Sequence, residues 1–159
     1  MRKAVFEAAR WLAVAAVIIM VISGAGSVKT SASDAKEVFE AVCAAVDTSE
    51  MQEGDRVMIK RLYGLDTDDY EGCYLLYPDT NMGAEEILVV KFAEGTDTQK
   101  LLDAVEKRIE AQKTSFDGYG IEQYELLTNH SVTELTGNFL LFAVSKNETD
   151  ALKAFRAAL

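Results

Sequence analysis

The chain has 159 residues, of which 49% are apolar and 26% are charged, a composition typical of one folded domain and not of a disordered chain. Its formal net charge of -10 argues against a nucleic-acid partner, because binding phosphates requires a surplus of lysine and arginine. A single histidine, His130, excludes a metal site built from several histidines. We therefore expect no nucleic-acid partner, no cofactor and no metal.

Residues 1–28 have the pattern of a leader. Arg2, Lys3 and Arg10 precede residues 11–28, which carry no charge. This order is typical of a signal peptide or of an N-terminal transmembrane helix, and the length of the apolar run falls between the two. We expect the chain to be anchored in the cell membrane by one span with its C-terminal part outside, or to be secreted after cleavage.

The remaining chain is predicted to be a short polar linker, residues 29–33, and one extracytoplasmic domain, residues 34–159. Asp34 and Glu37 form a capping-box pattern at the start of a first helix. Asp55 opens a second helix, which Gly64 ends because glycine readily adopts the left-handed conformation. Residues 66–72 (D-T-D-D-Y-E-G) are rich in acids but do not have the spacing of a calcium loop, so we interpret them as a solvated loop.

Four strands are predicted in the rest of the domain, from runs of β-branched and aromatic residues between turn signals. They span about residues 70–77, 85–92, 131–136 and 139–145. Helices are expected from a capping box at Thr96 and Gln99 to about residue 115, over residues 121–128, and from Asn147 onward. This order predicts an α+β fold, a four-stranded and mostly antiparallel sheet (ββα-ββα) with the two longer helices on one face.

Two structural questions stay open from the sequence. The central strands are apolar on both faces, so the second face is either covered by the helices near Phe39 and Met58 or left open for a partner. Cys43 and Cys73 are either two buried thiols or a disulfide, which an exported domain permits.

Two polar residues point to the core side of the helix predicted to end near residue 115. Arg108 and Gln112 lie inside or at the margin of its apolar stripe. In strand 85–92, the two-residue period places Glu86 toward the helices and Lys91 on the other, wetter face. We predict an ion pair between Arg108 and Glu86 with Gln112 assisting; the alternative is a binding-site arginine.

A series of short motifs follows the predicted elements. They are Y-G-L-D at residues 63–66 with Gly64, A-x-E-I (Ala84, Glu86, Ile87), R-x-x-x-Q (Arg108, Gln112), Phe116 with Tyr119, and Gly137 with Asn138. In this order, over about residues 33–159, they resemble the family named domain of unknown function 4358 (DUF4358). The resemblance implies a bacterial exported or lipid-anchored protein without an assigned activity, similar to proteins encoded near envelope O-acyltransferase systems. Many relatives carry a lipobox cysteine, which the leader of this chain lacks.

The sequence contains no catalytic motif of the common classes. G-x-S-x-G, P-loop, H-E-x-x-H and C-x-x-C patterns are all missing, so no catalytic residue is predicted. We expect a non-catalytic accessory or binding module of the bacterial cell envelope, associated with envelope O-acylation systems, whose partner is an envelope protein or polymer. The alternative is a hydrolase of cell-wall polymer that uses paired carboxylates.

Overall fold

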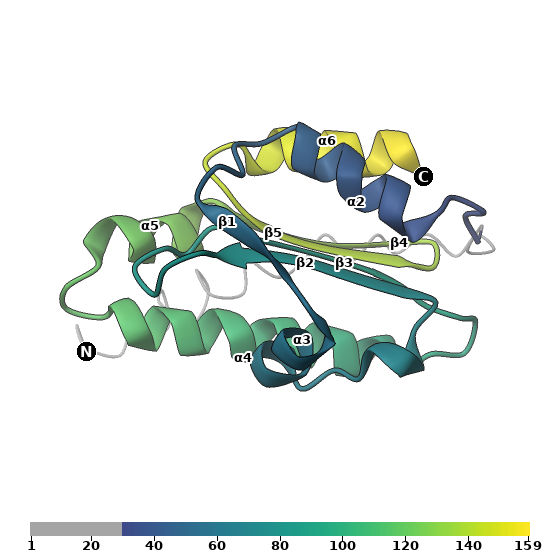
Figure 1. Ribbon diagram of the computed structural model, residues 1–159, viewed down its shortest axis with the longest axis horizontal. Helices are drawn as coiled ribbons and strands as arrows, with labels where there is room; N and C mark the ends of the chain where they lie inside the picture. Colours follow the sequence, from purple (N-terminus) through teal and green to yellow (C-terminus); the bar gives the residue numbers. More distant parts are fainter. Residues whose placement is uncertain (1–29) are drawn as a thin grey trace, which may run out of the picture.

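A computed structural model describes residues 30–159 of the chain (Figure 1). The predicted leader, residues 1–28, lies outside the described residues, as does the start of the linker at Lys29. Within residues 30–159, no helix is both long enough and apolar enough to cross a membrane. The expected membrane anchor or signal peptide therefore stays a prediction.

A five-stranded sheet forms the middle layer of the fold (Figure 1). Its strands lie in the order β1-β2-β3-β5-β4, and every neighbouring pair is antiparallel. The strands are β1 (Met51–Gly54), β2 (Gly72–Pro78), β3 (Glu86–Lys91), β4 (Ser131–Thr136) and β5 (Phe139–Val144). The prediction of an α+β fold with an antiparallel sheet is confirmed.

The prediction of four strands was wrong because it missed β1, at one edge of the sheet. β1 is four residues long, and its two middle side chains, Gln52 and Glu53, are exposed, so no apolar run indicates it. It pairs with β2 through four residues, with Gly54 opposite Leu75. A Cβ atom on Gly54 would lie 2.6 Å from Leu75 Cδ2, so a larger residue here would force the Leu75 side chain to move.

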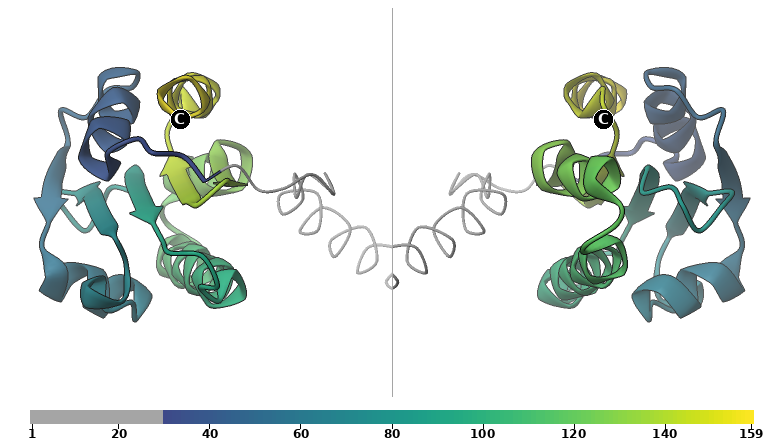
Figure 2. Two further views of the ribbon diagram at one scale, coloured as in Figure 1. Left: turned by 90° about the vertical axis from the view of Figure 1, so that its right-hand side faces the viewer. Right: turned by 90° about the vertical axis from the view of Figure 1, so that its left-hand side faces the viewer.

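Helices cover both faces of the sheet, as the two views in Figure 2 show. On one face lie α3 (Arg56–Tyr63) and α4 (Thr98–Phe116), followed by α5 (Ile121–Asn129), which adds to the same core. On the other face lie α2 (Ala35–Ala44) and α6 (Glu148–Ala158), side by side. The expected placement of the two longer helices on one face was therefore wrong, because α4 and α6 lie on opposite faces.

The sheet separates two apolar cores. Leu88 and Val90 of β3 face α3 and α4, whereas Ile87 and Val89 face α2 and α6, and all four are completely buried. Period two places alternate residues on opposite faces, so the sheet has no wet face along β3. The expectation of a wetter face, based on Lys91, was wrong: the strand ends there, and Lys91 Nζ donates to Ser33 O at 3.0 Å.

The second face of the sheet is covered, which answers the question left open by the sequence. Phe39 of α2 packs in this core, whereas Met58 of α3 packs against the first core. Phe155 of α6 meets Phe139 of β5 edge to face, with ring centroids 6.5 Å apart. At the far edge, the buried Glu134 of β4 accepts a hydrogen bond from Arg156 Nε of α6 at 2.9 Å.

The helix ends follow local chemistry closely. Asp34 caps α2 and Asp55 caps α3 through side-chain hydrogen bonds, and Gly64 ends α3 in the left-handed conformation, with φ at 70°. The predicted cap of α4 at Thr96 was wrong by one residue. Asp97 accepts the backbone N–H groups of the first turn instead, since its carboxylate is a strong N-cap acceptor.

Cys43 and Cys73 are free thiols and not a disulfide. They pack against different cores, so the sheet lies between them. Burial raises the pKa of both thiols to about 12, with the charge of Glu53 adding to the effect at Cys43.

The free energy of unfolding is expected to fall as pH rises from about 9 towards 12 because of these thiols. Unfolded thiols lose their protons near pH 9, whereas the folded thiols keep theirs until about pH 12, so ionisation stabilises the unfolded chain. Urea denaturation at several alkaline pH values measures this slope. A variant with both Cys43→Ala and Cys73→Ala should show a shallower decrease, and an equal slope would contradict the prediction.

Candidate functional site

Glu86 is a fully buried carboxylate at the start of β3. Arg108 Nη2 donates to its Oε2 at 2.7 Å, and Arg108 Nε donates to both carboxylate oxygens at 3.1 and 3.2 Å. Gln112 Nε2 donates to the same Oε2 at 3.1 Å. The predicted ion pair between Arg108 and Glu86 is present, with Gln112 bonded to the same carboxylate.

Three elements bring this Glu86 cluster (Tyr63, Glu86, Arg108 and Gln112) together. Glu86 lies on the same sheet face as Leu88 and Val90 of β3. Arg108 and Gln112 lie one turn apart on α4. Tyr63, the last residue of α3, donates its hydroxyl to Glu86 Oε1 at 2.5 Å. Sequence analysis missed this role of Tyr63. A buried tyrosine needs a hydrogen-bond partner for its hydroxyl, which was the available signal.

The negative charge of Glu86 raises the pKa of both Arg108 and Tyr63. Burial alone would lower the pKa of Arg108, but the hydrogen bond and negative charge of Glu86 outweigh it and raise that pKa. Burial, followed by the charge of Glu86, raises the pKa of Tyr63 well above its usual value. At neutral pH the arginine is therefore charged, and the tyrosine is a neutral donor.

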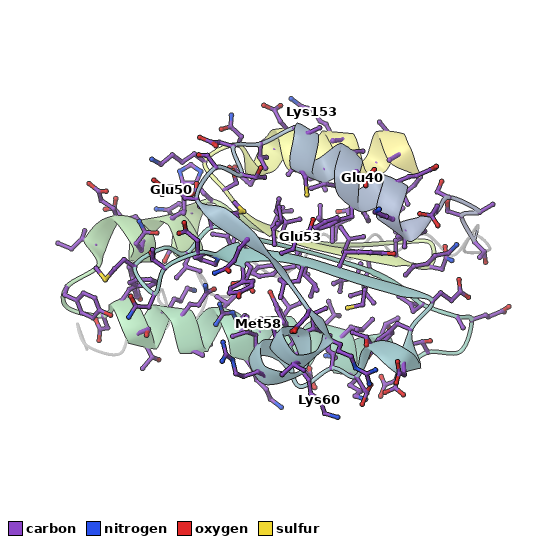
Figure 3. The ribbon with its side chains drawn as sticks, in the orientation of Figure 1. Glu40, Glu50, Glu53, Met58, Lys60 and Lys153 are labelled. Atoms are coloured by element: carbon purple, nitrogen blue, oxygen red, sulfur yellow. The ribbon has the colours of Figure 1, made fainter. Side chains whose placement is uncertain are left out.

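A cavity of about 520 Å³ lies beside this cluster, between α3, α4 and the loop that joins β2 to β3. Arg108 and Gln112 line it from α4, and Met58 and Arg61 line it from α3. Figure 3 labels Met58 on the side of α3 that faces the sheet, whereas Lys60 points away from the sheet. The cavity volume falls within the range of roughly 300–1,000 Å³ that is usual for small-molecule sites.

Three side chains that line this cavity, Gln112, Arg61 and Arg108, have hydrogen-bonding capacity that residues 30–159 do not fully use. Gln112 is 5% exposed, and its Oε1 accepts no hydrogen bond from the described residues. Arg61 pairs with no carboxylate in the same range, and its Nη2 contacts Met58 Sδ, a weak acceptor, at 2.8 Å. The hydrogen bonds of Arg108 use Nε and Nη2, which leaves Nη1 for another acceptor. Sequence analysis did not select Arg61, because an exposed arginine on a short helix gives no local signal.

Three further motif residues, Tyr119, Gly137 and Asn138, are not part of the Glu86 cluster. Gly137, with φ at 59°, and Asn138 form the turn before β5. This turn lies near Lys91, at the far end of β3 from Glu86. Asn138 Oδ1 accepts the backbone N–H of Ser31 at 2.9 Å, so it ties the linker to this turn. Tyr119 is 62% exposed, with its ring 6.2 Å from that of Phe116. Gly64, Gly137 and Asn138 therefore shape turns, and Glu86, Arg108 and Gln112 form the cluster.

Two acids among the described residues bear on a two-carboxylate site, Asp79 and Glu85. Asp79 is the one acid that lines the cavity beside the Glu86 cluster. Glu85 has a raised pKa because of burial and the nearby charges of Glu50 and Asp47, against the opposing charge of Lys146. Within residues 30–159, no group of three or more histidine, cysteine or acidic side chains is arranged to hold a metal ion.

The family model described as domain of unknown function (DUF4358) matches residues 44–145. The matched range runs from the end of α2 to the residue after β5 and contains all four members of the Glu86 cluster. No curated protein and no solved structure matches the chain.

Proposed function

The chain belongs to the DUF4358 family, and from this premise we propose that it is a non-catalytic binding or accessory module of the bacterial cell envelope. The observation that carries the proposal is the cavity beside the Glu86 cluster. Its lining residues include Gln112, whose buried Oε1 has no donor among residues 30–159, and the two arginines Arg61 and Arg108. These groups suit recognition of a polar ligand, and the single lining acid, Asp79, offers no partner for two-carboxylate catalysis.

The envelope location in this proposal comes from the leader and from the family resemblance. The basic start and uncharged run of residues 1–28 support export, and the acidic charge of the rest suits a domain held off an anionic bilayer. We propose a membrane-anchored or secreted domain whose partner is an envelope protein or polymer, with envelope O-acylation systems as its setting.

Protease added to intact cells is expected to degrade the domain, because the proposal places residues 30–159 outside the membrane. Protoplasts serve the same purpose where a cell wall blocks access. Immunoblotting with an antibody against the domain measures the loss, and a cytosolic protein in the same sample must stay intact. N-terminal sequencing of the mature chain then distinguishes the anchored form from the cleaved one. A domain that is protected in cells and soluble after lysis would overturn the proposed location.

A hydrolase of cell-wall polymer is the second candidate, favoured by the raised pKa of Glu85 next to Glu50 and Asp47. Such an enzyme needs one acid that keeps its proton and one carboxylate that is ionised. Incubation of the purified full chain with wall-derived polymer tests it. Release of soluble fragments by the chain, and its loss in a Glu85→Gln variant, would favour the hydrolase over the binding module.

A further inference from the structure

We infer that the cavity beside the Glu86 cluster binds an α-amino carboxylate: a carboxylate whose neighbouring carbon carries an N–H group. A free amino acid or dipeptide has this chemistry, and so does the C-terminus of a longer peptide. The inference rests on the proposed binding function and names the class of ligand for that site.

The carboxylate of the ligand is recognised by the two arginines. Glu86 already compensates the charge of Arg108, but no carboxylate among residues 30–159 compensates that of Arg61. The cavity lining therefore holds one guanidinium, that of Arg61, without an ion-pair partner among residues 30–159, and one acid, Asp79, which forms no ion pair with it. A guanidinium presents paired N–H donors that fit the two oxygens of a carboxylate, and Arg61 together with Nη1 of Arg108 supplies them.

The N–H group of the ligand is recognised by Gln112 Oε1. The orientation of the Gln112 amide is determined by Glu86, since a carboxylate only accepts hydrogen bonds and the amide NH₂ must face it. Oε1 is therefore an acceptor in a nine-tenths buried side chain, and it lacks a donor among the described residues. A buried acceptor without a donor is unfavourable. Gln112 lines the cavity, and Oε1 is enclosed in the ligand-free fold, so a shift of this side chain on binding would bring Oε1 to the ligand N–H.

The remaining wall of the cavity sets the size and the polarity of the rest of the ligand. Tyr77 and Pro78 of β2 and Phe116 of α4 provide apolar surface for a small side chain. Asp79, in the loop after β2, is exposed and would repel a second negative group. The same carboxylate would attract a free ammonium group, so Asp79 gives a means to tell a free amino terminus from a peptide amide.

Isothermal titration of the purified full chain with three short probes tests the inference. The probes are alanyl-alanine, N-acetyl-alanyl-alanine and N-acetyl-alanyl-alanine amide, each as the L,L and the D,D form. We expect the amide, which lacks the carboxylate, to bind at least about tenfold more weakly than the acetylated acid, because charged hydrogen bonds are lost. Equal affinity of the acid and the amide, or no binding of either acid, would overturn the inference.

Which of the two acids, alanyl-alanine or N-acetyl-alanyl-alanine, binds more tightly identifies the source of the ligand. Either result supports the inference. Tighter binding of alanyl-alanine indicates a free amino acid or dipeptide, with its ammonium group near Asp79. Tighter or equal binding of the acetylated acid indicates a peptide C-terminus, and the preferred stereochemistry then separates an L-peptide from a D-alanine-ended one.

A matched pair of variants on α3 assigns the binding to the cavity. Arg61→Gln is expected to weaken the binding of N-acetyl-alanyl-alanine by about tenfold or more. Arg56 is also exposed but lies outside the cavity lining, so Arg56→Gln should leave the affinity for this probe unchanged. Both side chains are exposed, so both variants should fold, and thermal melting verifies this. Unchanged affinity in a folded Arg61→Gln chain would overturn the site. If protease shaving places the domain outside while no probe binds, the ligand class fails and the envelope proposal stands.

Discussion

Replacing Arg108 with methionine is expected to lower the free energy of unfolding by about 3–5 kcal/mol. The change leaves the carboxylate of Glu86, which is completely buried, without its cation and without three charged hydrogen bonds. Urea denaturation followed by circular dichroism measures the loss. For a domain of this size, it corresponds to a decrease in Tm of roughly 10–20 °C.

Arg56→Met is the matched control for this experiment. It removes an ion pair of the same kind, between Arg56 and Asp68, but both side chains are largely exposed and the pair contributes little. We therefore expect a clear difference in Tm between the two variants. An Arg108→Met chain with the Tm of the wild type would show that the ion pair is not structural, and it would favour a role of Arg108 in binding alone.

Truncating Phe155 to alanine is expected to destabilise the domain by about 3–5 kcal/mol as well, through the cavity that it leaves. Phe155 is fully buried between α6 and the sheet, where it contacts Phe139 edge to face. The result would establish that α6 covers the second face of the sheet in solution. Thermal and urea denaturation measure it.

Ile121→Ala provides the control for Phe155→Ala. Ile121 is also a large apolar residue on a helix, but it is 71% exposed, so its truncation removes little buried surface. A small effect of Phe155→Ala, similar to that of Ile121→Ala, would mean that the second core is loosely packed or open.

The helices and four of the five strands, β2 to β5, were predictable because their signals are local. The caps at Asp34 and Asp55 and the left-handed Gly64 depend on neighbouring residues alone. β1 was not predictable in this way, because its pairing partner in β2 is more than 20 residues away and only one of its four residues, Met51, has an apolar side chain. The placement of α2 and α6 on the second face also depends on long-range packing, which a local pattern does not contain.

The same distinction applies to the candidate site. The periods of a helix and a strand were sufficient to pair Arg108 with Glu86, since both residues interrupt apolar positions that face the same core. Arg61 and Asp79 interrupt no such pattern, because both are exposed. Only the packing of α3 and the loop after β2 against α4 brings them to one cavity.

The two edges of the sheet have a consequence for how the domain behaves among its own copies. A free sheet edge presents unpaired backbone groups, which can template aggregation by pairing with a strand of another molecule. β1 is four residues long with exposed Gln52 and Glu53, and β4 carries Glu134, an inward-pointing charge that depends on Arg156 of the same chain. Short polar edges and buried edge charges are features with which natural sheets resist such growth. High local concentration at a surface should therefore not drive the sheets of neighbouring copies into continuous β-structure.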